Sequence, residues 1–500
     1  MSKMTSELIE KLYEYGKKVY NKELSLSDAT AEVLQSYKDS IAESSTEFYI
    51  GLVKDLVIGK GSTWNQNSDL LVYYVEHISV EMGTAIGTKA YQGAMKFAKA
   101  KSRQPLIDSL NKLKEQYGLD GQEDSNDEEV GETDLETKKT IDQIKKYIEA
   151  KGFSYDNNLI ENFYLSLKSK PFVILAGTSG TGKTKLVKLF AEAIDARYKL
   201  VSVRPDWSDS SDLFGHTNLK GEFVPGAIID YIKEASSDLQ RPYFLCLDEM
   251  NLARVEYYLS DFLSLIETRK RCNSEVITEC IELDKAATDY KGLYLPENLY
   301  FIGTVNMDET TFPFSKKVLD RANTIEFSFV DLMLDYDDEG DETTIPQNNE
   351  FLKTEYLVLK KDITEGQQQL VTKVCDELQT INKILQEANA HVGYRVRDEI
   401  VFYMLNNDAA KLIKYEDAFD NEIMQKILPR IQGSSAGVRD LLCKLFKKFA
   451  GDYSSFSDDK IWEQMQAFIA NKNCKYKNSA IKICYMMRRY EEDGFTSYWL

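Results

Sequence analysis

A glycine-rich segment of eight residues is the strongest chemical signal in this chain of 500 residues. The segment fits the pattern G-x-x-x-x-G-K-[ST] and reads Gly177-Thr178-Ser179-Gly180-Thr181-Gly182-Lys183-Thr184. Residues 172–176 before it are apolar, and residues 185–194 after it are amphipathic. The segment therefore joins a predicted strand to a predicted helix. Glycines in such a turn let backbone N–H groups converge on an anion at the helix N-terminus. The structural alternative is a glycine-rich turn before a core helix.

Two side chains at the end of this segment have distinct predicted roles. Lys183 can reach the β- and γ-phosphates of a nucleoside triphosphate, and the Thr184 hydroxyl can ligate Mg²⁺. We therefore predict that all eight residues from Gly177 to Thr184 bind nucleotide.

A pair of acids supports the same chemistry. Residues 243–247 form an apolar strand that ends in Asp248 and Glu249. Asp248 is predicted to hold Mg²⁺ through water, and Glu249 to polarise the attacking water as general base. Two adjacent acids at the end of a buried strand are costly unless a cation is near them. A surface turn is the alternative interpretation.

The composition limits the classes of function. The formal net charge of −19 argues against a chain that coats nucleic acid non-specifically, although it does not exclude a local basic channel. The seven cysteines form no C-x-x-C pair and there are three histidines, so we expect no zinc site and a reducing compartment. The N-terminus lacks an apolar signal core and no apolar stretch reaches 18 residues. These features favour a cytoplasmic protein with no membrane segment.

The pattern along the chain predicts several parts. The first part is helical, and its cluster of Lys96, Lys99, Lys101 and Arg103 can either touch phosphates or form a solvated helix end. Alternating strands and helices in 171–330 predict a parallel α/β sheet. The predicted parts are a helical N-terminal domain (1–115), a flexible acidic linker (116–138), an α/β nucleotide-binding domain (139–334), an acidic insertion (335–350), of which residues 335–342 are expected to be disordered, and a helical lid (351–500).

Taken together, several motifs resemble the McrB-like AAA+ NTPases, the motor subunits of modification-dependent restriction systems. Besides the glycine-rich segment, the resemblance rests on residues 204–209, 247–256, 303–308 and 318–323. It covers roughly residues 139–500, whereas the first 115 residues match no motif. It implies an α/β AAA+ core with a parallel sheet, an α-helical C-terminal lid and an all-α N-terminal domain.

The resemblance assigns roles to three further residues. Asn306 ends a strand beside the one that ends in Asp248, where its carboxamide would bind the γ-phosphate and the lytic water. Arg321 is the expected arginine finger, supplied to a neighbouring subunit. Arg395 resembles the sensor-2 arginine that binds nucleotide from the lid.

Each of these roles has an alternative. Asn306 is otherwise a strand-end turn residue, and Arg321 otherwise forms a surface ion pair with Asp320 or Glu326. Arg430 and Arg439 are further lid candidates for the role given to Arg395. The insertion 215–223 either faces a central pore, as in related AAA+ proteins, or is an ordinary hairpin tip.

The implied function is a Mg²⁺-dependent NTPase that hydrolyses GTP or ATP. It would assemble as a hexameric ring, drive a separate McrC-like endonuclease in defence against foreign DNA, and bind DNA or a partner through its N-terminal domain. The sequence departs from a well-known member of the family, which has Asn-Thr-x-Asp-Arg where residues 306–310 lack arginine. That departure weakens the transfer of strict GTP preference. The sequence also contains no nuclease signature, because Pro205-Asp206 has no Glu-x-Lys at useful spacing.

Two rival functions fit the same motifs. A MoxR-like ATPase would remodel protein complexes without any link to DNA cutting. A scaffold would use the nucleotide only as an assembly switch, and its slow turnover would not respond to partner proteins.

Overall fold

The computed structural model describes residues 4–21, 24–37, 41–57, 67–100, 103–117, 132–155, 158–272, 275–307, 312–327, 342–451, 456–457, 460–471 and 474–499. The chain divides into two units, Met1–Glu129 and Val130–Leu500, and each is described by itself.

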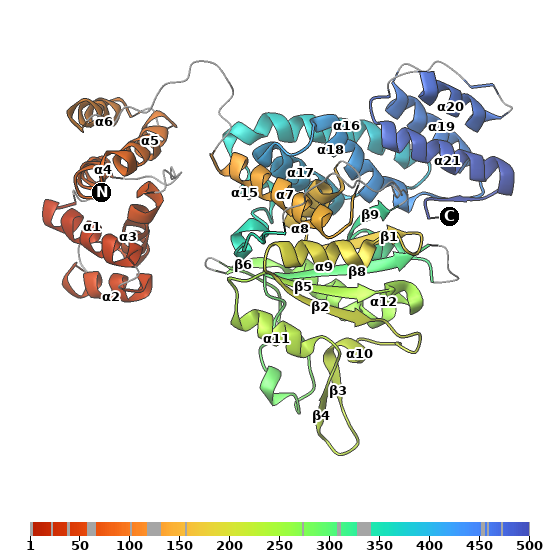
Figure 1. Cartoon of the computed structure of the whole chain (residues 1–500), viewed down its shortest axis with the longest axis horizontal. Coiled ribbons are helices and arrows are strands. Elements are labelled where there is room, and N and C mark those ends of the chain that lie inside the picture. The colour runs from red at the N-terminus through yellow and green to blue at the C-terminus, as the bar shows by residue number, and fades with distance from the viewer. Residues whose placement is uncertain are drawn as a thin grey trace. The chain divides into compact units, whose positions relative to one another are not determined.

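The first unit is helical, as the sequence predicts (Figure 1). Its described helices are α1 (Ser6–Tyr20), α2 (Leu26–Tyr37), α3 (Glu43–Val57), α4 (Ser68–Glu81), α5 (Thr84–Ala100) and α6 (Gln104–Tyr117). The core of this unit includes the fully buried side chains of Leu12, Val53 and Tyr74. Arg103 of the predicted basic cluster contacts its own domain, because its guanidinium lies 5.3 Å from the Phe97 ring. The other three side chains of that cluster lie outside the described residues.

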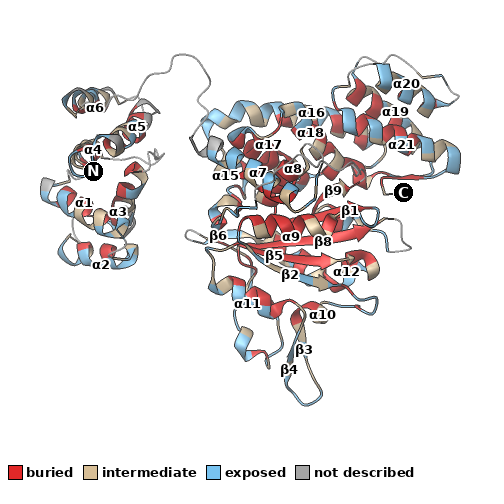
Figure 2. Ribbon diagram, in the orientation of Figure 1, coloured by how far each residue is buried: buried red, intermediate tan, exposed pale blue. Residues whose placement is uncertain are grey.

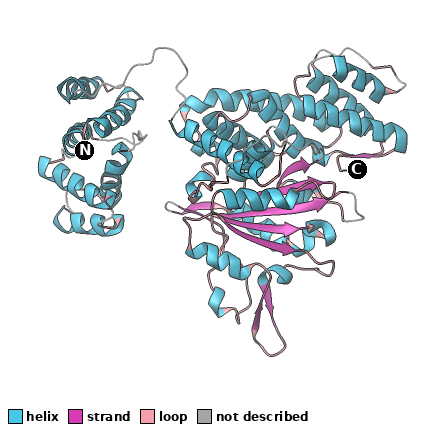
Figure 3. Cartoon of the chain, in the orientation of Figure 1, coloured by secondary structure: helices cyan, strands magenta, loops and turns pink. Residues whose placement is uncertain are grey.

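The second unit is built on a five-stranded parallel sheet (Figure 3). Its strand order is β2-β5-β8-β1-β9. The bounds are β1 (Phe172–Gly177), β2 (Arg197–Ser202), β5 (Tyr243–Asp248), β8 (Leu299–Asn306) and β9 (Asn323–Phe327). Strands β1 and β8 are buried along their whole length, as expected for a parallel sheet covered on both faces. This arrangement confirms the predicted α/β core.

Helices cover both faces of this sheet (Figure 2). Successive β1 residues contribute to the two different cores, as expected for a strand. Val173 and Leu175 face a core shared with the C-terminal helices, and Ile174 faces a second core. The first core also contains residues of α7 (Glu132–Ala150), α8 (Leu159–Ser169) and α9 (Lys183–Ala193). The second contains residues of α10 (Ser211–Phe214), α11 (Ile229–Ser237), η1 (Met250–Leu252), α12 (Val255–Tyr258), α13 (Ser260–Leu265), η2 (Ile266–Thr268) and α14 (Lys316–Leu319). Outside the two cores lie the hairpins β3 (Gly215–Thr217) with β4 (Phe223–Pro225) and β6 (Lys270–Cys272) with β7 (Glu275–Ile277). The short helix η3 (Thr288–Tyr290) packs against the second core through Tyr290.

The C-terminal part is mostly helical, as predicted for the lid. Its elements are η4 (Asn349–Phe351), α15 (Leu359–Asp362), η5 (Glu365–Gln367), α16 (Gln368–Glu387), α17 (Tyr394–Ala410), α18 (Tyr415–Glu422), the π-helix η6 (Ile423–Ile427), η7 (Leu428–Arg430), β10 (Gln432–Gly433), α19 (Ala436–Ala450), α20 (Ile461–Asn471), α21 (Lys477–Asp493) and β11 (Thr496–Ser497). Among the described residues, no helix is long and apolar enough to cross a membrane.

The structure describes only part of each of the two predicted acidic segments. Helix α7 begins at Glu132, so the end of the predicted linker 116–138 is helical, and residues 118–131 lie outside the described residues. Of residues 335–342, which are expected to be disordered, only Glu342 lies among the described residues. The later residues of the predicted insertion hydrogen-bond to the core through their backbone. The backbone N–H of Ile345 donates to Ala193 at 2.7 Å, and that of Asn349 donates to Gln240 at 2.7 Å. Residues 328–341 lie outside the described residues.

Candidate nucleotide site

The glycine-rich segment forms the turn between strand β1 and helix α9, as its sequence context predicts. Gly180 and Gly182 have φ values of 79° and 86°, in the left-handed region that glycine adopts without strain. Lys183 opens α9, and its side chain is buried. Its Nζ donates to the carbonyl of Gly177 at 3.1 Å and to that of Thr178 at 2.6 Å. The ammonium group is therefore folded back over the turn, at the place where a phosphate would bind.

Asp248 lies at the carboxyl end of β5 and receives two hydroxyl hydrogen bonds. Thr184 Oγ1 and Thr304 Oγ1 each donate to Asp248 Oδ1 at 2.7 Å. Thr184 and Asp248 present the hard oxygen donors that Mg²⁺ prefers, which fits their predicted roles. The described residues contain no group of three or more His, Cys, Asp or Glu side chains that could hold a metal ion by themselves. Phosphate oxygens and water would have to complete the coordination of the ion.

Glu249 and Asn306 meet at the same edge of the sheet. Asn306 ends β8, which lies between β1 and β5, and it pairs in register with Gly177. Its Nδ2 donates to Glu249 Oε1 at 2.9 Å. Glu249 has a φ of 53°, which is uncommon for a residue other than glycine. The predicted base and the predicted sensor therefore form one hydrogen-bonded pair, at a residue whose backbone conformation is uncommon.

Two residues at this site were not predicted. Thr304, besides contacting Asp248, accepts a hydrogen bond from the backbone N–H of Glu249 at 3.1 Å. Thr304 and Asn306 are two residues apart on one strand, so strand periodicity could have placed both on one face. Tyr155 donates from its hydroxyl to the carbonyl of Gly182 at 2.9 Å, and burial raises the pKa of its phenol. No local pattern connects Tyr155 with a turn 27 residues later.

Arg321 lies at the opposite edge of the sheet. It stands two residues before β9, whose first residue pairs with Val173 near the start of β1. Its Nε lies 3.8 Å from Glu267 Oε1, and the same oxygen lies 3.2 Å from Lys170 Nζ. Lys170 precedes β1, so at about 3.3 Å per residue this cluster is roughly 20 Å from the glycine-rich turn. Asp320 and Glu326, the predicted alternative partners of Arg321, pair with Arg430 and Lys482 instead.

Arg395 lies in the same cluster as Arg321. Its Nε contacts Glu267 Oε2 at 2.6 Å. The sensor-2 prediction expected Arg395 near the glycine-rich turn of its own chain. The structure instead places Arg395 far from that turn. Arg430, another lid candidate, lies 3.4 Å from Asp320 and donates to the carbonyl of His391. The packing of the lid explains the difference, because the first turn of α17 lies against the amino edge of the sheet.

The insertion at residues 215–223 forms the antiparallel hairpin of β3 and β4, which projects from the second unit in Figure 1. Leu219 at its tip is fully exposed, with a relative exposure of 109%. Asn218 Oδ1 accepts from the backbone N–H groups of Lys220 and Glu222, which shapes the tip. An apolar side chain held on a rigid projection suits contact with another molecule.

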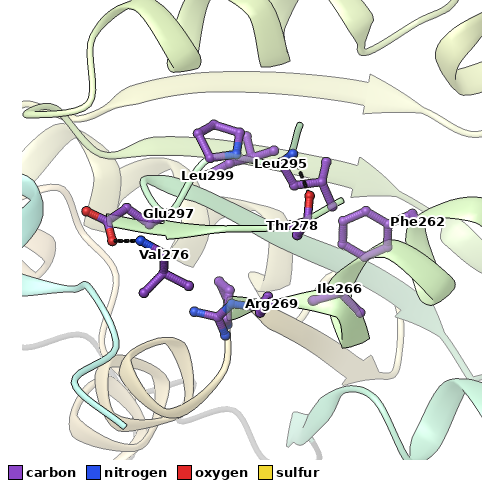
Figure 4. A pocket seen from close by; sticks show the side chains of 10 residues that line it. Phe262, Ile266, Arg269, Val276, Thr278, Leu295, Glu297 and Leu299 are labelled. Atoms are coloured by element: carbon purple, nitrogen blue, oxygen red, sulfur yellow. Dashed lines mark hydrogen bonds between the residues drawn. The ribbon is translucent and has the colours of Figure 1, made fainter. Parts of the chain in front are cut away.

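A small pocket lies at the amino edge of the sheet and is distinct from the nucleotide site (Figure 4). Its volume is about 20 Å³, enough for about one water molecule. Phe262, Ile266 and Arg269 form part of its wall, and Thr278 accepts a hydrogen bond from the backbone of Leu295 at 3.0 Å. The pocket is too small for a nucleotide.

Comparison with known families agrees with this geometry. The model of the AAA domain of the dynein-related subfamily matches residues 172–322, which include every residue from Gly177 to Arg321 discussed above. This part of the chain is an AAA+ NTPase domain. A domain of unknown function, DUF8727, matches residues 342–495, the helical part of the second unit.

Individual relatives share only part of their length with this chain. The EcoKMcrB subunit of the type IV methyl-directed restriction enzyme of Escherichia coli K12 is 24% identical over 241 residues, which are 47% of this chain and 47% of that subunit. The Lon protease of Mycoplasma mobile is 30% identical over 168 residues, which are 33% of this chain and 18% of the protease. The crystal structure of a full-length MCM homolog from Methanopyrus kandleri has a TM-score of 0.33 and 11% identity, with 59% of this chain and 61% of that one covered. The chain thus spans about half the length of the restriction subunit and less of the protease.

Proposed function

We propose that this NTPase is an McrB-like motor subunit, which assembles as a ring and drives a separate endonuclease subunit in DNA restriction. One observation carries the proposal. Within one chain, Arg321 lies at the edge of the sheet opposite the edge that would bind nucleotide. As an arginine finger, Arg321 would complete the catalytic site of a second copy by reaching that copy's nucleotide. Similarity to the restriction subunit of E. coli supports the choice of partner.

Nucleotide binding would rest on the turn between β1 and α9. The backbone N–H groups of the turn and the dipole of α9 favour the phosphates of ATP or GTP. Lys183 would exchange its two carbonyl contacts for the β- and γ-phosphates. Tyr155 would keep the turn in place through its bond to Gly182.

Thr184 and Asp248 are the residues that would hold Mg²⁺, directly and through water. The ion, when bound, would neutralise charge that develops on the phosphates during transfer. Thr304 keeps Asp248 oriented by its hydrogen bond, so the carboxylate stays aimed at Thr184.

Hydrolysis would then require three groups. Glu249 would take a proton from the attacking water, and Asn306 would orient that water and the γ-phosphate. Arg321 of the neighbouring subunit would stabilise the negative charge of the transition state, an effect worth several orders of magnitude in rate.

The remaining parts would connect the motor to its targets. We assign recognition of DNA or a partner to the helical domain 1–115, and contact with the central pore to the β3–β4 hairpin. Its exposed tip residue Leu219 supports that assignment.

A second candidate is an ATPase that remodels protein complexes, as MoxR-like proteins do. The matches to Lon proteases favour it, because those relatives act on proteins. A third, a scaffold with a nucleotide switch, would show slow turnover without stimulation.

One experiment separates these functions. The full chain is purified with the product of the neighbouring gene, and hydrolysis of ATP and of GTP is measured together with DNA cleavage, for the parent and for Glu249→Gln. The proposal expects cleavage that needs the partner and hydrolysis, and that the variant abolishes. If a protein substrate stimulates hydrolysis and the product of the neighbouring gene cleaves no DNA, the remodelling function would be supported instead.

A further inference from the structure

Glu267 contacts two arginines that belong to different parts of the second unit. It lies in η2, after α13, and its side chain is 22% exposed. Its Oε1 lies 3.8 Å from Nε of Arg321, which precedes β9. Its Oε2 lies 2.6 Å from Nε of Arg395, in the first turn of α17. One carboxylate thus forms ion pairs with Arg321, through a 3.8 Å contact that is not a hydrogen bond, and with an arginine of the helical part.

The backbone around Glu267 is fixed by hydrogen bonds. Thr268 donates to the carbonyl of Leu265 at 2.8 Å and accepts from the backbone N–H of Glu279 at 2.8 Å. Ile266 and Arg269, on either side of this turn, line the small pocket of Figure 4. The first residue of β8, Leu299, lines the same pocket. The carboxylate therefore projects from a rigid turn.

A buried network of ion pairs lies next to the two arginines. Glu399 of α17 pairs with Lys170 and, at 2.5 Å, with Lys426 of η6. Lys426 Nζ also donates to the carbonyl of Ala322, the residue after Arg321, at 2.7 Å. Burial alone would raise the pKa of Glu399, but the ammonium groups of Lys170 and Lys426 outweigh it and lower that pKa, so Glu399 is ionised. The helical part is thus tied to the backbone that carries Arg321.

Both arginine side chains are partly exposed, Arg321 to 22% and Arg395 to 40%. Each arginine makes its shortest contact with Glu267 through Nε, the nitrogen nearest the chain, whereas the terminal nitrogens lie further along the side chain. Nη1 of Arg321 donates to the carbonyl of Lys317 at 2.9 Å. A phosphate of a neighbouring nucleotide could therefore bind Nη2 of Arg321 and the terminal nitrogens of Arg395 while Glu267 keeps its place. Long arginine side chains otherwise lose rotamer freedom when they bind.

We propose that Glu267 is a positioning residue that holds Arg321 and Arg395 as a preordered pair for the nucleotide of a neighbouring subunit. This inference rests on the proposed function, since it assumes that Arg321 acts on another copy. It predicts that Glu267 affects the rate of hydrolysis through Arg321 and leaves nucleotide binding to its own subunit unchanged.

The test is a double-mutant cycle in the full chain. The maximal hydrolysis rate and the half-saturating nucleotide concentration are measured for the parent, Glu267→Gln, Arg321→Ala and the double variant. We expect Glu267→Gln to lower the maximal rate about 10-fold with the half-saturating concentration unchanged. In the Arg321→Ala background the same change should cause a much smaller further loss, because Glu267 acts through that arginine. Glu279→Gln, an exposed carboxylate nearby, is the matched control and should match the parent.

The outcomes separate the two claims. If Glu267→Gln keeps the parental rate, or lowers it equally with and without Arg321, the positioning role is refuted. If Arg321→Ala itself keeps the parental rate, the arginine finger of the proposed function fails whatever Glu267 does. Glu267→Asp, which keeps the charge, should recover part of the rate. A Glu267→Asp rate no higher than that of Glu267→Gln would also contradict the inference.

Discussion

Glu422, at the end of α18, provides a stability prediction that can be worked out from its surroundings. Its side chain is buried and neither carboxyl oxygen has a hydrogen-bond partner. Burial raises the pKa of Glu422 from 4.5 to about 8, and nearby Lys426 only partly offsets this. The folded protein therefore keeps a proton on Glu422 at neutral pH, whereas the unfolded chain has lost it.

The sign of the pH effect follows from this difference. A carboxyl group whose pKa is raised in the folded state contributes stability that is complete below the unfolded pKa and is lost as pH rises through the folded pKa. Between about pH 6 and about pH 8, Glu422 should lower the free energy of unfolding by roughly 2 kcal/mol. Glu422→Gln removes the titration, so the variant should lack this part of the decline.

The assay is urea unfolding of the parent, Glu422→Gln and Glu416→Gln at both pH values. Glu416 lies on the same helix and is exposed, so its variant should follow the parent. Asp420, a buried neighbour whose pKa is also raised by burial, is present in all three proteins, and its effect cancels in the comparison. Identical pH dependence of the parent and Glu422→Gln would refute the reasoning.

Three further predictions concern the site and the domains. Lys183→Ala removes the ammonium group that would contact the β- and γ-phosphates, so it should weaken nucleotide binding by about 10- to 100-fold in a fluorescent-nucleotide titration. Unchanged affinity would refute the assignment of the nucleotide site. Thr304→Val leaves the Glu249 N–H unpaired and should slow hydrolysis about 10-fold or more, whereas Thr304→Ser should not; equal rates would contradict the role of the hydroxyl. A fragment of residues 130–500 should fold and hydrolyse nucleotide but lose target-dependent cleavage, and an insoluble fragment would show that the first unit is structural.

The nucleotide-binding edge was predictable because its signals are local. The glycine-rich segment lies between an apolar run and an amphipathic one, and the acids follow another apolar run. The parallel sheet then brings the carboxyl ends of β1, β5 and β8 to one edge, which places Asn306 beside Glu249. Local pattern and sheet geometry together were enough for these residues.

The contacts that were missed join segments far apart in sequence. Tyr155 reaches Gly182 across the turn, and Glu267 meets Arg395 only because α17 packs on the amino edge of the sheet. The sequence predicted an acidic insertion at residues 335–350 but did not indicate that Ile345, Gln347 and Asn349 hydrogen-bond to the core through their backbone. Composition does not report such backbone hydrogen bonds, since any residue except proline can donate them.

The central claim, that two copies complete one catalytic site, is tested most directly by mixing inactive variants. Glu249→Gln and Arg321→Ala proteins are each purified, mixed in equal amounts and assayed for nucleotide hydrolysis. Each alone should keep only a small residual rate, because every interface lacks one group. The mixture should regain part of the parental rate, since interfaces that join Glu249 of one variant to Arg321 of the other are intact. A mixture as inactive as its components, or full hydrolysis by Arg321→Ala alone, would contradict the account.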